Sequence, residues 1–490
     1  MTAQPPPAGR RLPGRRPLAI SGRYRTNATD PQPGGRPGEV VYAKSEATRL
    51  AGRRVHGLVC SWIDTAGIHR IKAVPVGVLD SAVAWGVGMS PVFDTFLADD
   101  SIVATDVLGT PDGDLRLYPD LDRLTILAAQ PGWAWAPVDR LTQEGTAHPA
   151  CTRTLLRRQV AALAARGIAV RTAIEIEFAL GRADAPEGEF VPAVSGPAYG
   201  MTRLVEQSAF AAALLEALAA QDVDVDQVHP EYAAGQFEVS VGALDPVAAA
   251  DRSVLVRETI RALAQQHGLR ASFSPAVVAG SVGNGGHVHL SIWRDGRNLH
   301  SGGDGPYGLT SEAEAFTAGV LRELPALAAV ATPSPASYLR LVPSHWAGAF
   351  AAWGRETRET AIRLVTGMVG RRERSANIEV KAVDLAANPY LLLASLLAAG
   401  SAGLDAVATL PEEVTGDPAR FDAAELERRG VRRLPTSLPE ATQAFTASAV
   451  LRGALGPVLH DAVVAVRRGE AARVEGLEPD ALAAAYRWVY

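Results

Sequence analysis

Residues 172–178, TAIEIEF, decide how the centre of this chain folds. In an extended strand the side chains alternate between two faces, so Ile174, Ile176 and Phe178 point one way and Glu175 and Glu177 the other. Two neighbouring carboxylates repel each other unless a positive group compensates them. The stretch therefore predicts a strand with a buried apolar face and an acidic face that either meets water or binds a cation.

Three later segments repeat this alternation: QFEVSV (236–241), HVHLSIW (287–293) and NIEVKAV (377–383). If their polar faces only met water, Lys, Thr and Arg would occur there freely, but Glu and His dominate. Convergence of so many carboxylates requires compensating charge. The carboxylates in question are Glu175, Glu177, Glu231, Glu238 and Glu379.

The donor set of these strands indicates the kind of ion. Carboxylate oxygens with one imidazole suit Mg²⁺ or Mn²⁺ better than zinc, which favours Cys and His. Two such ions would also suit the phosphates of a nucleotide. The sequence therefore predicts a site with two metal ions.

Arginines follow the acidic strands. YLRLVP (338–343) contains Arg340, and WGRETRETAIR (353–363) contains Arg355, Arg358 and Arg363. Guanidinium groups grip carboxylate and phosphate with two hydrogen bonds. Surface ion pairs with the nearby Glu356 and Glu359 are an equally good interpretation. No Walker loop, GxGxxG fingerprint or GxSxG elbow is present, so metals and arginines would have to hold any phosphate.

Composition excludes several classes. The 490 residues are 47% hydrophobic with a net charge of -5, which implies no basic surface for nucleic acid. The two cysteines, Cys60 and Cys151, form no CxxC pattern, and no secretion signal is apparent, so we expect a cytoplasmic protein. The uncharged stretch 385–404 predicts a buried helix, capped by Asn388 with Pro389 in its first turn, and not a membrane span.

The chain divides into three parts by composition. Residues 1–45 predict a disordered Pro/Arg-rich extension, residues 46–145 a small β-rich domain, and residues 146–490 a larger α+β domain. Two strands are expected around the turn at residues 64–67. Helices are expected from apolar spacing and Gly stops at 151–167, 204–220, 244–267, 311–331, 388–409 and 441–468.

These motifs, in this order and at these separations, resemble the glutamine synthetase family, type I branch, and in particular its γ-glutamyl-amine ligase members. The resemblance runs from about residue 50 to the C-terminus. It rests on EIEF (175–178), HPEYAAGQFE (229–238), GSVGNGGHVHLSIW (280–293), SYLRLVP (337–343), RETAIR (358–363) and NIEVKAVDLAANPYLLLASLLAAG (377–400).

The resemblance implies an α+β fold with an N-terminal β-grasp domain and a catalytic domain built as an antiparallel, metal-lined funnel surrounded by helices. It also implies homo-oligomeric rings, with a double-ring dodecamer expected, and each site at a subunit interface. In the chemistry of the family, ATP phosphorylates the γ-carboxylate of glutamate, and an amine then displaces the phosphate.

Roles carried over from the family fall on named positions. One metal would bind Glu177, Glu231 and Glu238, and the second Glu175, His287 and Glu379. The nucleotide positions match His289, Ser291 and Arg363. Arg340 matches the grip on the substrate carboxylate, Gly283 a backbone contact to the amino acid, and Arg358 a stabiliser of the phosphorylated intermediate.

The ammonium pocket departs from the family pattern. Trp346 stands where glutamine synthetases carry a glutamate on a flap, and Ser90, with Asp94 close by, aligns roughly with the aspartate that enters from a neighbouring subunit. Ammonium needs negative charge to bind and a base to lose a proton. An indole instead offers an apolar wall or a face for a cation, and Tyr199 could line the same wall.

The side that would bind glutamate also departs. Val282 replaces an Asn of the glycine loop, Lys381 replaces an Arg near the γ-carboxylate, and Asn377 replaces an Arg near the nucleotide. Lysine keeps the charge of arginine but loses its fork. A related acid substrate therefore stays open beside glutamate.

The sequence thus predicts an ATP-dependent ligase that joins glutamate to an organic amine, with Mg²⁺ or Mn²⁺ as cofactor and with no membrane or nucleic acid as partner. Polyamines, ethanolamine, other monoamines and aromatic amines remain open as acceptors, and the small number of expected carboxylates leans against polyamines. Three alternatives are an ammonia-using glutamine synthetase, a catalytically silent structural or regulatory relative, and a two-metal phosphohydrolase.

Overall fold

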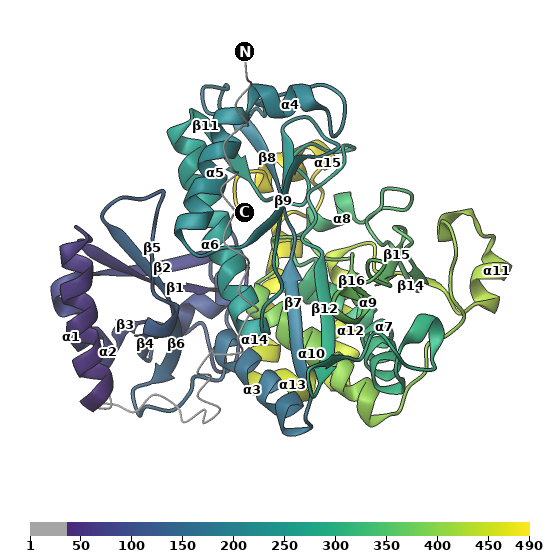
Figure 1. Ribbon diagram of the computed structural model, residues 1–490, viewed down its shortest axis with the longest axis horizontal. Coiled ribbons are helices and arrows are strands. Elements are labelled where there is room, and N and C mark those ends of the chain that lie inside the picture. Colours follow the sequence, from purple (N-terminus) through teal and green to yellow (C-terminus); the bar gives the residue numbers. More distant parts are fainter. Residues whose placement is uncertain (1–36) are drawn as a thin grey trace, which may run out of the picture. The chain divides into compact units, whose positions relative to one another are not determined.

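The structure, a computed structural model, describes residues 37–490 (Figure 1). It begins with helix α1 (Pro37–Gly52). The disordered extension predicted for residues 1–45 is therefore wrong for residues 37–45, and residues 1–36 lie outside the described part. The composition of the preceding Pro/Arg-rich run concealed the start of this helix, because its first residue is itself a proline, which is well tolerated in a first helical turn.

The first part of the described chain forms a six-stranded sheet with a buried cluster of its own. The strand order is β2-β1-β6-β4-β3, with β5 also paired to β6. β1 runs parallel to β6, whereas its pairing with β2 is antiparallel. Side chains of α1 and α2 share one buried cluster with the sheet. The elements are β1 (Gly57–Ile63), β2 (His69–Pro75), α2 (Leu79–Trp85), β3 (Val87–Met89), β4 (Leu115–Pro119), β5 (Thr125–Ile126) and β6 (Trp133–Thr142).

Two further sheets make up the second part of the chain. One has the order β11-β8-β10-β9, and the other β13-β12-β16-β15-β14-β17 with β7 also paired to β12. Their pairings are antiparallel except that of β14 with β15. The strands of the first are β8 (Ile176–Arg182), β9 (Val225–Pro230), β10 (Gln236–Val241) and β11 (Leu269–Ser272). Those of the second are β7 (Ala169–Ile174), β12 (Val288–Arg294), β13 (Arg297–Asn298), β14 (Phe350–Arg355), β15 (Thr360–Val365), β16 (Asn377–Val380) and β17 (Arg432–Arg433).

The stretch 172–178 is not one strand, contrary to the prediction. β7 ends at Ile174 and β8 begins at Ile176, so the chain passes from one sheet to the other at Glu175. The Glu175 amide donates to the His287 carbonyl at 3.0 Å, just before β12 begins. The alternation itself holds across the break, because Ile174, Ile176 and Phe178 are all buried. Glu175 therefore lies where the two sheets meet.

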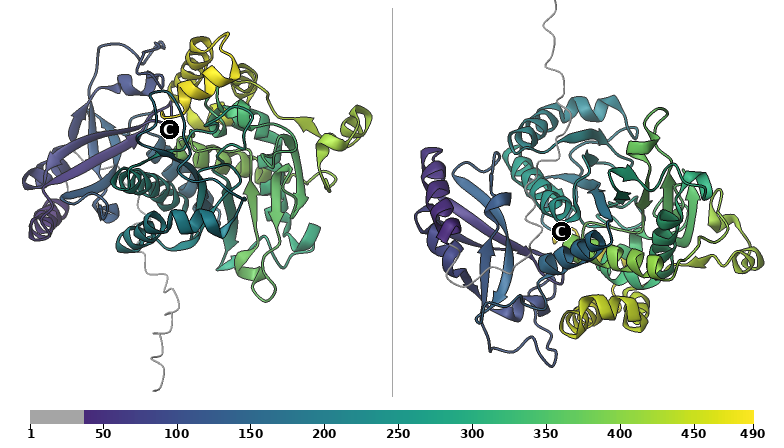
Figure 2. Two further views of the ribbon diagram at one scale, coloured as in Figure 1. Left: turned by 90° about the horizontal axis from the view of Figure 1, so that it is seen from above. Right: turned by 60° about the horizontal axis from the view of Figure 1, so that its bottom comes forward.

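Helices pack around the sheets of the second part of the chain (Figure 2). The predicted helices at 311–331 and 388–409 are confirmed as α7 and α10, and Asn388 caps α10 by accepting from Tyr390 and Leu391. The helices are α3 (Thr152–Ala165), α4 (Met201–Glu206), α5 (Ser208–Ala220), α6 (Pro246–Gln266), α7 (Ser311–Ala331), α8 (Ser337–Arg340), α9 (Arg372–Ser375), α10 (Pro389–Asp405), α11 (Ala423–Arg428), α12 (Leu438–Ala447), α13 (Ala449–Leu455), α14 (Pro457–Arg473) and α15 (Pro479–Tyr486).

The single helix expected at 441–468 is wrong, because the segment forms α12, α13 and α14. Ser448 caps α13 by accepting from the Leu451 amide. Gly456 has a φ of 75°, which ends α13, and Pro457 opens α14. Apolar spacing continued through these two breaks and concealed them. The predicted α+β class is otherwise confirmed.

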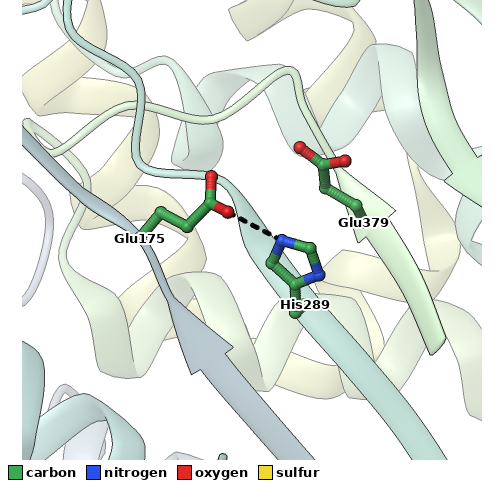
Figure 3. Close-up of side chains that lie close together, drawn as sticks. All are labelled: Glu175, His289 and Glu379. Carbon is green, nitrogen blue, oxygen red and sulfur yellow. Dashed lines mark hydrogen bonds and ion pairs between the residues drawn. The ribbon is translucent and has the colours of Figure 1, made fainter. Parts of the chain in front are cut away.

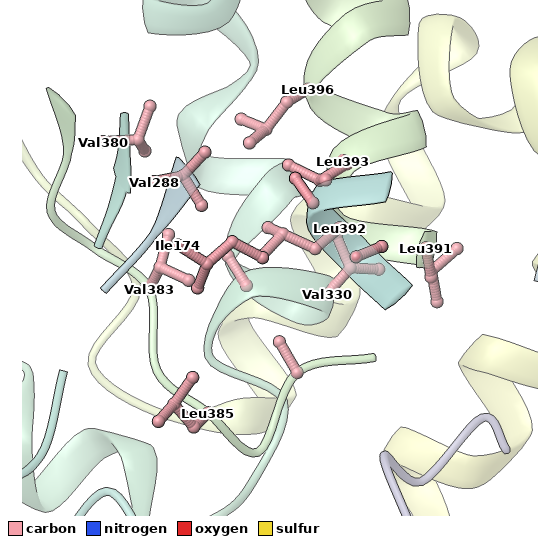
Figure 4. Packing of buried hydrophobic residues seen from close by; sticks show 14 of the residues in the cluster. Ile174, Val288, Val330, Val380, Val383, Leu385, Leu391, Leu392, Leu393 and Leu396 are labelled. Carbon is pink, nitrogen blue, oxygen red and sulfur yellow. The ribbon is translucent and has the colours of Figure 1, made fainter. Parts of the chain in front are cut away.

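The apolar faces of the site strands pack against α10. Ile174, Val288 and Val380 lie beside Leu392 and Leu396 in the large buried cluster of the second part (Figure 4). Burial of each such side chain contributes about 1.5–3 kcal/mol to folding. The opposite faces of the same strands are thereby held in a fixed arrangement, and these are the faces that carry Glu and His.

Within residues 37–490, no single helix is long and apolar enough to cross a membrane. The pair α13 and α14 passes on length and composition only when taken together, and it is bent by 116° at Gly456.

Candidate active site

His287 lies among three carboxylates. Its Nδ1 is 2.8 Å from Glu175, 3.5 Å from Glu379 and 3.8 Å from Glu177. Arg340 donates from Nη2 to the His287 Nε2 at 3.0 Å, and an arginine cannot accept a hydrogen bond. The Nδ1 must then carry the ring proton and donate it to Glu175. The Arg340 guanidinium thereby supplies part of the positive charge that the acidic stretch required.

Glu175 also contacts His289, and Glu379 faces both of them from the neighbouring strand β16 (Figure 3). The His289 Nε2 is 3.0 Å from Glu175 Oε1, and its Nδ1 is 2.8 Å from the Asn377 side-chain oxygen. Burial disfavours the charged imidazole, but Glu175 and Glu379 outweigh it and raise the pKa of His289 to about 9. Both ring nitrogens therefore donate, and His289 is an imidazolium.

Glu379 is 2% exposed, and two cationic side chains contact its carboxylate. Lys381 Nζ lies 3.1 Å from its Oε1, and Arg363 donates to its Oε2 at 3.0 Å from the register position opposite on β15. Burial raises the pKa of this carboxyl, but Lys381 and the two histidines hold it at about 2. In the same way, burial of Glu175 is outweighed by His289 and His287, which hold its pKa well below the usual range.

Glu177 and Glu238 stand directly opposite each other on β8 and β10. The Gly285 amide donates to Glu177 at 2.7 Å, and Gln236 donates to the same oxygen at 3.1 Å. A side chain at Gly285 would collide with Arg340, His287 and Glu177, so only glycine allows this approach. Burial and the neighbouring Glu238 raise the pKa of Glu177, although Arg340 and the Gly285 amide favour its charged form.

Glu231, after β9, completes this second group with His229. The His229 ring is 3.3 Å from Glu231 and 3.6 Å from Glu238, and Tyr199 donates its hydroxyl to Glu231 at 2.6 Å. Burial, together with the charges of Glu177 and Glu238, raises the pKa of Glu231 to about 7. This part of the site therefore carries acidic groups with little positive compensation.

Two sets of potential ligand atoms result. We call Glu175, His287, His289 and Glu379 the first cluster, and Glu177, His229, Glu231 and Glu238 the second cluster. Glu175, His289 and Glu379 can each offer one atom within 4.8 Å of the others, as can His229, Glu231 and Glu238. Carboxylate oxygens with imidazole suit Mg²⁺ or Mn²⁺, and the raised pKa values of the second cluster indicate that a cation fits there.

Four other predicted site residues are held in place by contacts with their neighbours. Arg340 is buried and donates to the Val383 carbonyl besides His287. A Cβ at Gly283 would meet the Pro275 carbonyl and Arg340, and the Gly283 carbonyl accepts from Gln236 at 3.0 Å. Ser291 is buried on β12, where its hydroxyl accepts from Trp293. Arg363 makes the predicted alternative contact with Glu356 as well, at 3.2 Å.

Arg358, Ser90 and Asp94 are not brought to either cluster within the described chain. Arg358 is exposed and makes no hydrogen bond or ion pair with any residue of 37–490. Ser90 caps a short 3₁₀ turn by accepting from Val92 at 3.3 Å. Asp94 is buried in an ion pair with Arg140 at 2.8 Å, which uses both of its oxygens. Asp94 therefore cannot serve as the acidic group considered beside Ser90.

Trp346 is 46% exposed, and its ring stands edge-on to Tyr232, with 5.1 Å between centroids. Tyr232 in turn stands edge-on to Tyr199 at 5.6 Å. The aromatic wall expected from Trp346 and Tyr199 thus includes a third ring between them. It ends at Glu231 of the second cluster, which Tyr199 contacts.

Sequence reasoning missed His229, Gly285, Tyr232 and Glu359. His229 precedes Glu231 by two positions, so the period of two that found the other ligands could have found it. Tyr232 is in the quoted motif HPEYAAGQFE. Glu359 accepts the Trp346 amide at 3.0 Å and was considered only as an ion-pair partner for arginine.

The chain is similar to known proteins of one family. The profile of the family described as "Glutamine synthetase, catalytic domain" matches residues 149–481. A γ-glutamylpolyamine synthetase of Streptomyces coelicolor is 68% identical over 463 residues, which cover 94% of this chain and 99% of that protein. A glutamate–methylamine ligase of Methyloversatilis universalis is 30% identical over 446 residues, covering 85% and 93%.

Solved structures of related proteins are also similar to this chain. A structure titled as a novel glutamine synthase homolog has a TM-score of 0.80 at 32% identity and covers 89% of this chain and 99% of its own. A complex of GmaS with ADP has a TM-score of 0.77 at 27% identity and covers 88% and 96%. Enzymes of this family use ATP and divalent metal ions to form carbon–nitrogen bonds between small molecules. The chain belongs to the glutamine synthetase family of ATP-dependent carbon–nitrogen ligases.

Proposed function

We propose that this enzyme joins the γ-carboxylate of glutamate to an organic amine, and that the acceptor is a polyamine. The observation that supports an amine larger than ammonium is the aromatic wall of Trp346, Tyr232 and Tyr199, which replaces the acidic flap of ammonia-using enzymes. The name of the Streptomyces coelicolor relative, at 68% identity, supports a polyamine. This proposal departs from the sequence analysis, which leaned against polyamines because it expected few carboxylates around the wall.

In the proposed reaction, ATP phosphorylates glutamate to γ-glutamyl phosphate and ADP. The amine nitrogen then attacks the acyl carbon, the phosphate leaves, and the amine proton passes to a base. Arg340 would hold the α-carboxylate of glutamate, because its guanidinium is buried and fixed by His287 and Val383. The Gly283 backbone would contact the amino acid, and Lys381 would face its γ-carboxylate from beside Glu379.

Two Mg²⁺ or Mn²⁺ ions would be held by the two clusters, one by Glu175, His287 and Glu379 and the other by Glu177, Glu231 and Glu238. His229 lies close enough to contribute to the second cluster. When bound, such ions neutralise phosphate charge during phosphoryl transfer. His289, Ser291 and Arg363 would contact the nucleotide, and Arg358, exposed and without an ion pair among residues 37–490, would stabilise the phosphorylated intermediate.

We also propose that the protein assembles into rings, as a double-ring dodecamer, in the cytoplasm, where ATP is available. Ser90 would then reach the site of a neighbouring subunit, because among residues 37–490 it meets neither cluster and its hydroxyl caps a turn. Light scattering of the purified protein gives the mass of the assembly. A monomer that is fully active would contradict the shared site.

Phosphate release from ATP with Mg²⁺ and glutamate tests the function, across ammonium and a panel of mono-, di- and triamines with mass detection of the products. We expect turnover that depends on a di- or triamine, little turnover with ammonium, and a γ-glutamylamide product. Efficient turnover with ammonium would mean ordinary glutamine synthesis. Phosphate release without any amine would mean a hydrolase, and no release at all would mean a silent relative or a different acid.

A further inference from the structure

The loop of residues 341–349, here called the Trp346 loop, is fixed at both ends. Arg433 donates to the carbonyls of Leu341 and Ala349. Gly348, with a φ of 71°, lies so close to Lys381 that a Cβ there would approach the Lys381 Cβ to 2.9 Å. The loop therefore lies against a residue of the candidate glutamate site. Its conformation is strained, because Ser344 and Trp346 also have positive φ values of 60° and 55°.

Glu359 lies under this loop and is nearly buried, with 9% of its surface exposed. Its Oε1 accepts the Trp346 amide at 3.0 Å. No lysine, arginine or histidine of residues 37–490 forms an ion pair with it. Buried carboxylates are normally paired with a cation, and burial without such a pair raises the pKa of Glu359. Glu359 is thus a buried acid that lacks a cationic partner.

Three titratable groups act on the pKa of Glu359 besides its burial, namely Asp417, which raises it, and Lys381 and His345, which lower it. Lys381 is already engaged by Glu379 at 3.1 Å, and His345, on the loop itself, is exposed. Asp417 accepts the Ser344 hydroxyl at 2.7 Å. Two acidic groups therefore lie close to the Trp346 loop, and neither forms an ion pair with Lys381 or His345.

The aromatic wall runs from this acid back to the second cluster. Trp346, Tyr232 and Tyr199 are 46%, 41% and 54% exposed, and each contacts the next edge-to-face. Tyr199 ends on Glu231 at 2.6 Å. Rings of this kind provide apolar surface for a methylene chain and attract cations to their faces. An acceptor with an apolar chain and a distal cation matches aromatic rings of this kind beside a carboxylate that contacts the Trp346 amide.

We propose that Glu359 binds the non-reacting ammonium group of a diamine or polyamine acceptor, while the aromatic wall flanks its methylene chain. This inference rests on the proposed amine-ligase function and identifies the residue that selects acceptors with a second positive charge. Glu359 is a specificity-determining residue here and takes no part in the transfer of phosphate. Its contact with the Trp346 amide places the loop that carries the wall.

The test compares each diamine with the monoamine of equal chain length, for example 1,4-diaminobutane with 1-aminobutane, in the wild type and in Glu359→Gln. Glutamine can still accept the Trp346 amide, so the loop keeps its anchor and only the charge is removed. We expect the ratio of kcat/KM for diamine over monoamine to fall by ~10–100-fold, mostly through KM, because one partner of a buried charge pair is lost. Glu359→Asp, which keeps the charge, should recover part of the ratio.

Glu427→Gln is the matched control, because Glu427 is an exposed glutamate on α11 and its loss changes the net charge equally. It should leave the ratio unchanged. A wild-type ratio near one, or an equal fall for both amines in Glu359→Gln, would overturn the role of Glu359 and leave the amine-ligase function standing. Absence of turnover by the wild type with every amine would overturn the function itself, and this inference with it.

Discussion

The two clusters of the site hold similar numbers of carboxylates but compensate them differently. In the first cluster, Glu379 contacts Lys381 and Arg363, and Glu175 contacts two histidines. In the second cluster, Glu231 and Glu238 meet only His229 as a cationic partner within residues 37–490. The pKa of Glu379 is accordingly held at about 2, whereas that of Glu231 is raised to about 7.

This difference shows that neighbouring carboxylates on one sheet surface need not behave alike. Side chains of the protein itself hold the pKa values of Glu175 and Glu379 below the usual carboxyl range. The second cluster must give up a proton before all of its carboxyls are charged, so cation binding there is coupled to proton release. The first cluster is therefore expected to depend on its pairing residues, and the second on pH and metal.

Glu379→Gln should have the largest effect. It removes a ligand and leaves Lys381, which is 2% exposed, without its carboxylate. We expect amine-dependent phosphate release to fall by ~10²–10³-fold or more. Unfolding experiments should show a loss of about 3–5 kcal/mol, because an uncompensated charge stays buried. Glu373→Gln, on the exposed helix α9, is the control and should alter neither quantity. A stable, active Glu379→Gln enzyme would contradict the proposed role of the first cluster.

Arg340→Lys should raise the KM for glutamate by about 10–100-fold, with a smaller effect on kcat, because lysine keeps the charge but cannot form two parallel hydrogen bonds. Glutamate saturation curves at fixed amine and ATP measure this change. A KM equal to that of the wild type would mean that another residue binds the α-carboxylate.

The metal-free protein should lose stability as the pH rises through 7. Between the ordinary carboxyl pKa and about 7, folded Glu231 holds a proton that the unfolded chain lacks, so the free energy of unfolding falls as the pH increases. We expect a loss of on the order of 1 kcal/mol from pH 5.5 to 8, since Glu231 is partly in contact with solvent. Thermal unfolding of the wild type and Glu231→Gln over this range, in EDTA, measures it. The variant should show a flatter profile, and equal profiles would contradict the assignment.

His229→Asn should weaken the binding of Mn²⁺ to the second cluster by about tenfold, the usual effect of removing a group that supports the ligands. The exposed His56 provides the matched control, His56→Asn, which should bind Mn²⁺ like the wild type. Mn²⁺ titration of both variants distinguishes the outcomes. Unchanged affinity in His229→Asn would restrict the second cluster to its carboxylates.

Alternating side chains made much of the site predictable. Glu175, Glu177, Glu238, His287, His289 and Glu379 all occupy the polar faces expected from a period of two, and their apolar neighbours form the core. The same period could not reveal that the chain changes sheets at Glu175. Side-chain alternation continues through that break, and only the pairing partner changes, which depends on residues far away in the sequence.

The pairing of charged groups was harder to predict from the sequence than the residues that form the site. Glu359 follows Arg358 directly in the sequence, so a surface ion pair was the natural expectation. Instead Glu359 lies under the Trp346 loop, where the contact that fixes it is a backbone amide. Similarly, Asp94 lies four positions after Ser90 but forms an ion pair with Arg140. Contacts of this kind join segments that only the tertiary fold brings together.

Titration of the wild type with Mn²⁺ at pH 6 and pH 8, with proton release measured in buffers of different ionisation enthalpy, tests the contrast between the clusters most directly. We expect two Mn²⁺ sites for each chain. One should change little in affinity with pH, and the other should bind more tightly at pH 8 and release close to one proton at pH 6. A single site, or two sites whose affinities and proton release do not depend on pH, would contradict it.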